Sequence, residues 1–172
     1  MSDIELAQSM QEGSEKKAEE VILLNYKNNY INDKGYRGSV LYGGTADLAM
    51  IRELFSQIIE AQKILNNDLS FAEKVGQALS QLHPYQIGKK GNLQEWYYDW
   101  EDQDPRHRHV SHLFAAYPGR SITMNKTPEL ANAVKRSLEL RTNNGTGWSI
   151  AWKIGLWARL RNADMAYDAI KT

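Results

Sequence analysis

The sequence predicts an all-α fold built from stacked helical hairpins. Apolar residues recur at helical spacing in several segments of the 172-residue chain. No alternating apolar and polar run is long enough for a central β-strand. Polar turns separate the helical segments, so successive helices can pack back on one another as hairpins. The length is that of one domain with one core.

The first part of the chain, residues 1–24, is predicted to be a charged helical segment with sparse apolar positions. Residues 25–44 are rich in Asn, Gly and Tyr, a composition typical of an irregular loop with tight turns. We therefore place the main domain at residues 25–172 and treat residues 1–24 as a separate segment.

Two amphipathic helices are expected next. The first covers residues 45–65, with Thr45 as its N-cap and apolar residues at helical spacing behind it. The second begins at Ser70, which forms a capping-box pattern with Glu73, and it stops before Pro84. Together these two helices predict one helical hairpin.

Residues 86–118 form a long region with few regular signals, apart from a short helix expected within residues 110–117. A loop of this length inside a compact domain is more often functional than accidental. Beyond it, Thr127 followed by Pro128 is typical of a helix start. Three further helices are expected at residues 127–141, 148–161 and 163–171.

Composition narrows the class of partner. The 21 Lys and Arg residues equal the 21 Asp and Glu residues, so the net charge gives no reason to expect nucleic acid or a membrane as partner. A neutral ligand fits better. The chain has no Cys and no apolar run long enough to span a membrane. Its first residues also lack the apolar stretch of a secretory signal, so we expect it to stay unexported as written.

The polar loops of the second half suggest a carbohydrate site. They combine Trp, Glu, Arg and His, and such polar groups need partners when they are buried. The five Trp and nine Tyr residues supply aromatic faces that stack on the C–H faces of sugars, although aromatic residues are also ordinary core material. The candidate binding residues are Glu95, Trp96, His107, His109, His112 and Trp148.

The three His residues of this set allow three interpretations. They could bind a metal, but Arg108 between two of them opposes a cation, and no carboxylate or Cys completes a diagnostic spacing. They could hydrogen-bond the backbone and hold the loop. They could also bind sugar hydroxyls, because neutral imidazole donates from one nitrogen and accepts at the other. The residues alone leave the last two interpretations open.

Glu95 and Asp99 lie four residues apart, so on a helical turn they would share a face, and Asp102 and Asp104 follow closely. Inverting glycoside hydrolysis needs two carboxyl groups roughly 6.5 to 9.5 Å apart. These residues are therefore fallback candidates for a catalytic pair, Glu95 and Asp99 first. The alternative is a solvated acidic loop that faces the neighbouring Arg side chains.

Several motifs carry a family resemblance. They are Gly91 to Trp96, His107 to Leu113, Tyr117 to Gly119, Thr127 to Leu130, Gly145 to Ser149 and Ala151 to Leu160. In this order they resemble the later part of the catalytic domain of glycoside hydrolase family 95, from about Gly35 to the last residue. The family comprises inverting α-L-fucosidases and some α-L-galactosidases, which are often exported. The resemblance implies part of an (α/α)6 toroid, a fucosylated or related glycan as substrate, and neither metal nor cofactor.

The resemblance also implies roles for single residues. One His of the cluster, His109 first, is expected to contact the sugar, and Glu95 with Trp96 to wall its pocket. The family's general acid is a Glu in a Ser-Pro-Glu-Asn motif, where this sequence has Lys27. The general base and two supporting Asn residues are expected beyond the two ends of this sequence. We therefore expect the isolated chain to lack both catalytic carboxylates.

Three functional interpretations remain at this stage. The chain is a fragment of an α-L-fucosidase-like enzyme, a non-catalytic carbohydrate-binding or interaction module, or a degenerate remnant. Part of a toroid would expose apolar helix faces, which usually mark association. We therefore expect a homo-oligomer or a complementing fragment. The faces expected to be exposed are Ile51, Phe55 and Ile58, or Ile154 and Trp157.

Overall fold

The computed structural model describes residues 30–31, 37–38, 43–102 and 104–171. The chain divides into two compact units, one of residues 1–42 and 100–103 and the other of residues 43–99 and 104–172. The charged segment predicted at residues 1–24 and the general-acid position Lys27 lie outside the described residues. The helices of the second unit confirm the all-α fold class.

Within the first unit, the described residues include one short β-ladder. Strand β1 (Tyr30–Ile31) pairs antiparallel with strand β2 (Arg37–Gly38). It lies in the region for which the composition predicted tight turns.

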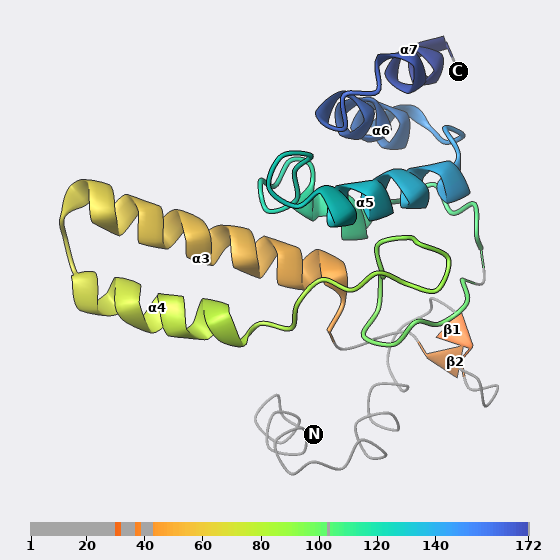
Figure 1. Cartoon of the computed structure of the whole chain (residues 1–172). Helices are drawn as coiled ribbons and strands as arrows, with labels where there is room; N and C mark the ends of the chain where they lie inside the picture. The colour runs from red at the N-terminus through yellow and green to blue at the C-terminus, as the bar shows by residue number, and fades with distance from the viewer. Residues whose placement is uncertain (1–29, 32–36, 39–42, 103, 172) are drawn as a thin grey trace. The chain divides into compact units, whose positions relative to one another are not determined.

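The second unit is helical, and its elements follow one another as in Figure 1. They are α3 (Thr45–Leu65), α4 (Leu69–Gln81), the 3-10 helix η1 (Ser111–Ala115), α5 (Pro128–Arg141), α6 (Gly147–Arg159) and α7 (Ala163–Lys171). Helices α3 and α4 pack side by side as a long antiparallel hairpin, and α6 packs against α7 as a second pair. The predicted helical hairpins are therefore present.

Two predicted helix starts differ from the structure. Gly44, not Thr45, is the N-cap residue of α3. The predicted capping box of α4 is wrong, because that helix begins at Leu69 and Asp68 caps it by accepting a hydrogen bond from the Phe71 backbone N–H. Ser70 lies inside the first turn, and its hydroxyl donates to the Asp68 side chain instead. An Asp at this position satisfies one of the free N–H groups of the helix start.

The later helix starts agree with the sequence. Thr127 is the N-cap residue of α5 and Pro128 is at its first turn. Helix α6 begins at Gly147 with a capping box between Thr146 and Ser149. Pro128 is well suited to the start of α5, because the first N–H groups of a helix lack an internal partner.

The core lies among η1, α5, α6 and the segment around Leu93. Its largest fully buried apolar side chains are Trp157, Leu93, Leu113, Ile122, Leu138, Leu156, Val110 and Val134. The exposed face predicted for Trp157 is therefore wrong, since the ring is buried and its N–H donates to Asn143 Oδ1 at 2.9 Å.

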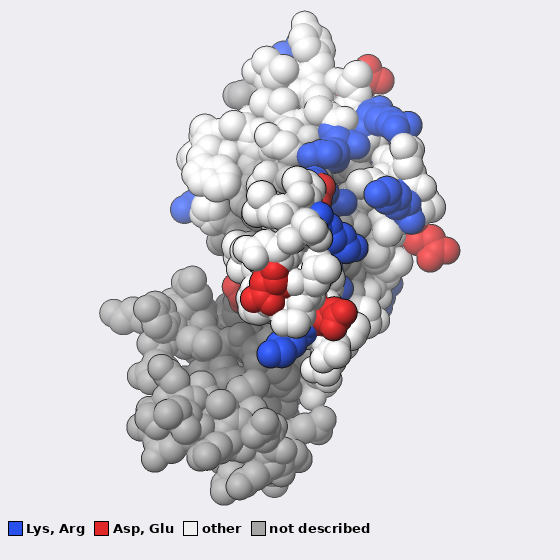
Figure 2. Space-filling view, turned by 90° about the vertical axis from the view of Figure 1, so that its left-hand side faces the viewer, with Lys and Arg blue, Asp and Glu red and all other residues white. Residues whose placement is uncertain are grey.

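Exposed apolar side chains gather on the α3–α4 hairpin and include Ile51, but Phe55 and Ile58 of the same predicted face are half-buried. The exposed side chains are Met50, Ile51, Leu54, Ile64, Leu65, Leu69 and Phe71. On the face shown in Figure 2, Lys and Arg lie among Asp and Glu over a mostly uncharged surface. Within the described part of the chain, no helix combines the length and the apolar character needed to cross a membrane.

Candidate functional site: a buried charged cluster and an aromatic pocket

Glu95 is held between two helices by its backbone. The Leu93 N–H donates to Ser137 Oγ on α5 at 2.9 Å. Two residues further on, the Thr45 N–H at the start of α3 donates to the Glu95 carbonyl at 2.9 Å. The segment from 93 to 95 is therefore fixed at both ends, and this places the Glu95 side chain against the end of α5.

The Glu95 carboxylate meets two partly or wholly buried basic groups. Its Oε2 accepts from Arg141 Nη2 at 2.6 Å and lies 3.4 Å from His112 Nδ1. The Arg141 and His112 side chains are 6% and 3% exposed, whereas Glu95 keeps 19% of its side chain accessible. Part of the Glu95 side chain is therefore accessible, whereas its two partners are almost fully enclosed.

Lys153 adds a second buried cation. Lys153 is fully buried, although it is a charged residue. Its Nζ donates to the carbonyls of Thr142 and Asn144 at 2.9 and 2.8 Å. These two bonds satisfy the ammonium group in place of water. We call Glu95, His112, Arg141 and Lys153 the charged cluster.

Burial governs the ionisation of the charged cluster. It raises the pKa of Glu95 above its usual range, although the Arg141 charge and hydrogen bond act in the opposite direction. Burial also lowers the pKa of Lys153, and the nearby Arg141 charge lowers it further. Compared with the same groups in water, the Glu95 carboxyl group therefore holds its proton more readily, and the Lys153 ammonium group loses its proton more readily.

His107 and His109 lie on an exposed loop next to the charged cluster. Their rings are 5.2 Å apart at 45°, and the His109 N–H donates to His107 Nδ1 at 3.3 Å. Arg141 Nη1 donates to both carbonyls, at 3.5 Å for His107 and 3.3 Å for His109. Partial desolvation, followed by the Arg108 and His107 charges, lowers the pKa of His109.

The three predicted His residues therefore separate into two settings. His112 is buried against Glu95, whereas His107 and His109 are exposed. Across the described residues, no three His, Cys, Asp or Glu side chains are grouped so that they could hold a metal ion.

The acidic residues after Glu95 do not share a helical face with it, because residues 91–99 are not helical. Asp99 Oδ2 accepts from the Lys89 N–H at 2.7 Å and closes a neighbouring turn. Asp102 belongs to the other compact unit. Asp104 Oδ1 accepts from the Arg106 N–H at 3.2 Å, which is typical of an Asx turn. The spacing argument for a Glu95–Asp99 pair on one face is therefore wrong.

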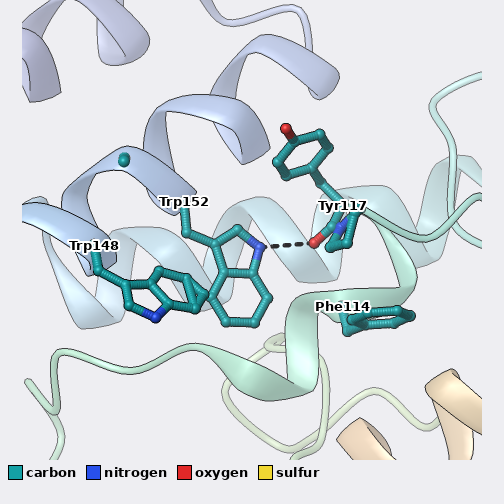
Figure 3. Close-up of a pocket in the computed structure, with 6 residues that line it drawn as sticks. Phe114, Tyr117, Trp148 and Trp152 are labelled. Atoms are coloured by element: carbon teal, nitrogen blue, oxygen red, sulfur yellow. Dashed lines mark hydrogen bonds between the residues drawn. The ribbon is translucent and has the colours of Figure 1, made fainter.

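Trp148 lies in an open pocket of about 680 Å³, which we call the aromatic pocket. It is lined by Phe114, Tyr117, Pro118, Trp148, Ala151 and Trp152. The Trp148 and Trp152 rings stack at 4.7 Å, and the Trp152 N–H donates to the Tyr117 carbonyl at 2.8 Å (Figure 3). Trp148 remains 62% exposed. Its indole is therefore available to a ligand.

Trp96 lies elsewhere, half-buried beside Gly44 at the start of α3. The structure thus brings Glu95 and His112 together, places His107 and His109 next to them, and puts Trp148 in the aromatic pocket. Sequence reasoning missed Arg141 and Lys153, because nothing local distinguishes them from surface residues. It also missed the stacking of Trp148 on Trp152, which their spacing of four residues on one helix could have indicated.

Comparisons with known proteins identify the family of the chain. Residues 16–172 match the family model of the glycosyl hydrolase family 95 catalytic domain. The chain is 47% identical over 138 residues to "Alpha-L-fucosidase 2" of Arabidopsis thaliana, covering 79% of this chain and 16% of that protein.

Two fungal relatives are more distant. A "Probable alpha-fucosidase A" of Aspergillus niger is 32% identical over 139 residues, covering 75% of this chain and 17% of the relative. The protein of the same name from Aspergillus oryzae is 30% identical over 150 residues, covering 78% and 20%. The chain thus spans a fifth or less of the length of these relatives, and it belongs to glycoside hydrolase family 95.

Proposed function

We propose that this chain forms part of the catalytic domain of an α-L-fucosidase-like glycoside hydrolase and supplies one wall of its sugar pocket. The observation that carries the proposal is Glu95, whose carboxylate is bonded to Arg141 and lies beside His112 while part of its side chain stays accessible. The helical hairpins are then a segment of an (α/α)6 toroid, with the remaining segments supplied by the rest of a full-length protein.

The chemistry of this wall suits a neutral sugar. A carboxylate accepts hydrogen bonds from hydroxyl groups, and an imidazole both donates and accepts. Glu95 and His109 would therefore take adjacent hydroxyls of a terminal α-L-fucosyl unit. Trp148 would cover an apolar C–H face of the substrate, since its ring is exposed and rigidly stacked.

Hydrolysis by inversion needs one carboxylic acid and one carboxylate that activates water. Glu95 is already bonded to Arg141, and Asp99 is bonded to the Lys89 N–H, so neither is placed to act alone as a free acid or base. We propose that the two catalytic carboxylates come from other segments of the full-length protein. Glu95 and Asp99 remain the fallback pair.

Association is the second proposal. The exposed apolar side chains of the α3–α4 hairpin favour a partner, either another copy of this chain or a complementing segment of the same kind of domain. If association without catalysis is the whole function, the chain is an interaction or carbohydrate-binding module.

Titration of the purified chain with L-fucose, followed by NMR, tests the first proposal. We expect saturable shifts of the His109 ring signals, with D-glucose as the control sugar. His109→Ala should weaken binding by about 1 to 3 kcal/mol, because a sugar hydroxyl loses its partner. Equal responses to both sugars, or an unchanged affinity in His109→Ala, would exclude this sugar site.

An assay with an aryl α-L-fucoside tests whether the catalytic carboxylates lie outside this chain. The isolated chain should show no turnover above background, since each general acid or base is typically worth about 10² to 10⁴ in rate. If the chain turned over the substrate and Glu95→Gln or Asp99→Asn abolished the activity, the fallback pair would be the catalytic one.

A further inference from the structure

The geometry points to Arg141 as the positioning residue of the sugar-binding wall: its guanidinium group sets the place of the His107–His109 loop relative to the Glu95 carboxylate. This inference rests on the proposed function, because it concerns the same wall. It assigns the role to a residue that contacts no sugar itself.

Arg141 joins two segments of the wall through one rigid group. Its Nη2 donates to Glu95 Oε2 at 2.6 Å. Its Nη1 donates to the His109 carbonyl at 3.3 Å and the His107 carbonyl at 3.5 Å. Because the guanidinium group is planar and its donors have fixed directions, the separation of the two segments follows from its geometry. A lysine ammonium has a single nitrogen and cannot impose this separation.

Hydrogen bonds within the His loop shape it, and Arg141 ties it to the rest of the domain. The His107 N–H donates to the Asp104 carbonyl at 2.9 Å, and the Arg106 N–H donates to the Asp104 side chain at 3.2 Å. These bonds lie within the loop, so they shape it without fixing where it sits on the domain. The bonds from Arg141 connect it to the end of α5.

The backbone beside Arg141 is strained. Thr142 has φ 59° and ψ 171°, a conformation that residues other than glycine rarely adopt. The buried Lys153 holds this residue, since its Nζ donates to the carbonyls of Thr142 and Asn144 at 2.9 and 2.8 Å. Strained residues persist when the surrounding structure fixes them, and they concentrate at functional sites. Here the strained residue directly follows Arg141, at the C-terminal end of α5.

Stability alone does not account for this arrangement. A buried ion pair loses hydration, and a well-packed apolar pair of similar volume is often equally stable or more stable. An apolar pair, however, gives no directional link to the two loop carbonyls. The property specific to Arg141 is therefore orientation of the wall.

Arg141→Lys is the first test, because it keeps the positive charge and much of the side-chain length. Arg136→Lys is the matched control, since Arg136 lies on the same helix, is exposed, and donates to the Lys90 carbonyl at 3.3 Å, away from the wall. Three quantities are compared: the thermal unfolding midpoint, the backbone amide signals of residues 106–110, and the affinity for L-fucose.

We expect Arg141→Lys to remain folded, with displaced amide signals in residues 106–110. Its affinity for L-fucose should fall about tenfold or more, because small misplacements of binding groups are costly. Arg136→Lys should match the wild type in both. A residue that only stabilised the fold would lower the unfolding midpoint without changing the affinity of the folded protein. Unchanged loop signals or unchanged affinity in folded Arg141→Lys would overturn the inference.

The inference stays testable if Arg141→Lys does not fold or if the wild-type chain does not bind L-fucose. If Arg141→Lys does not fold, the guanidinium NMR signals of Arg141 in the wild-type chain decide instead. Separate, slowly exchanging Nη1 and Nη2 signals show a guanidinium group held from both sides and support the inference, whereas one averaged signal overturns it. If the wild-type chain binds no L-fucose, the proposed function fails, and the loop signals of Arg141→Lys alone decide whether Arg141 positions the loop.

Discussion

Helix α6 contributes Lys153 to the charged cluster and Trp148 with Trp152 to the aromatic pocket, and these two regions differ in burial and in the contacts that hold them. Lys153 points into the core, whereas Trp148 and Trp152 line the open pocket. The cluster is held by directional bonds to buried charges. The pocket is held by stacked rings and one indole hydrogen bond. Helix α6 therefore contributes to one region that is held by directional hydrogen bonds and to another that is formed by stacked aromatic rings.

This difference predicts how each region responds to substitution. Buried charges are costly once a partner is lost, because the remaining charge has no water to replace it. Removing an exposed aromatic ring lowers the free energy of unfolding only slightly. Substitutions in the charged cluster should therefore affect both folding and binding, whereas substitutions of the exposed pocket ring should affect binding alone.

The largest effect is expected for Arg141→Leu. This change leaves Glu95 as a buried carboxylate without its cation, so it should lower the free energy of unfolding by about 3 to 5 kcal/mol. Urea unfolding followed by circular dichroism measures the loss. A loss below about 1 kcal/mol would mean that the pair is solvated and that the contrast between the two regions is wrong.

Glu95→Gln is the next test, and it has a pH signature. Burial raises the pKa of Glu95 in the folded chain above its ordinary value of 4.5. The stability that this shift contributes is fully present below pH 4.5 and is lost as the pH rises through the raised pKa. Gln does not titrate. The unfolding free energy of the wild type minus that of Glu95→Gln should therefore decrease as the pH rises above 4.5.

Urea unfolding of both proteins across a pH series measures this difference. Glu139→Gln, which removes an exposed carboxylate on α5, controls for the loss of a negative charge. A difference that grew with pH would show that the ion pair with Arg141, rather than burial, dominates the ionisation of Glu95.

The sequence predicts features that depend on neighbouring residues better than features that depend on contacts between distant segments. The bounds of α3, α5 and α7 depend on apolar periodicity and caps, which are local signals, and they were predicted closely. The cap of α4 was missed because Asp68 and Ser70 are both good capping residues and only the backbone decides between them.

The charged cluster could not be predicted from local signals. Arg141 and Lys153 look like surface residues in the sequence, and their burial follows from packing between segments far apart along the chain. Glu95 and Asp99 were compared as if on a helix, but hydrogen bonds from Gln94 to the Trp96 and Tyr97 carbonyls accompany an irregular turn there. The His motif pointed to the site that we propose, whereas the supporting contacts of that site depend on tertiary structure.

In the aromatic pocket, Trp152→Phe should have a moderate effect. The substitution keeps an aromatic ring but removes the N–H that donates to the Tyr117 carbonyl at 2.8 Å. We expect a loss of about 0.5 to 1.5 kcal/mol in the free energy of unfolding, the usual worth of one hydrogen bond. Chemical unfolding gives the value. A loss as large as that of Arg141→Leu would show that the pocket is as strongly coupled to the core as the charged cluster.

Trp148→Ala should have the smallest effect on folding. The Trp148 ring is 62% exposed and its stacking on Trp152 is its main contact, so the unfolding free energy should fall by no more than about 1 kcal/mol. Binding is expected to respond differently. An aryl α-L-fucoside should lose several-fold in affinity, because the ring offers a flat apolar face beside the pocket. Intrinsic Trp fluorescence during titration of wild type and Trp148→Ala measures this, with Tyr167→Ala as an exposed aromatic control outside the pocket. Equal affinities in wild type and Trp148→Ala would remove the aromatic pocket from the sugar site and leave the wall to the charged cluster and its His loop.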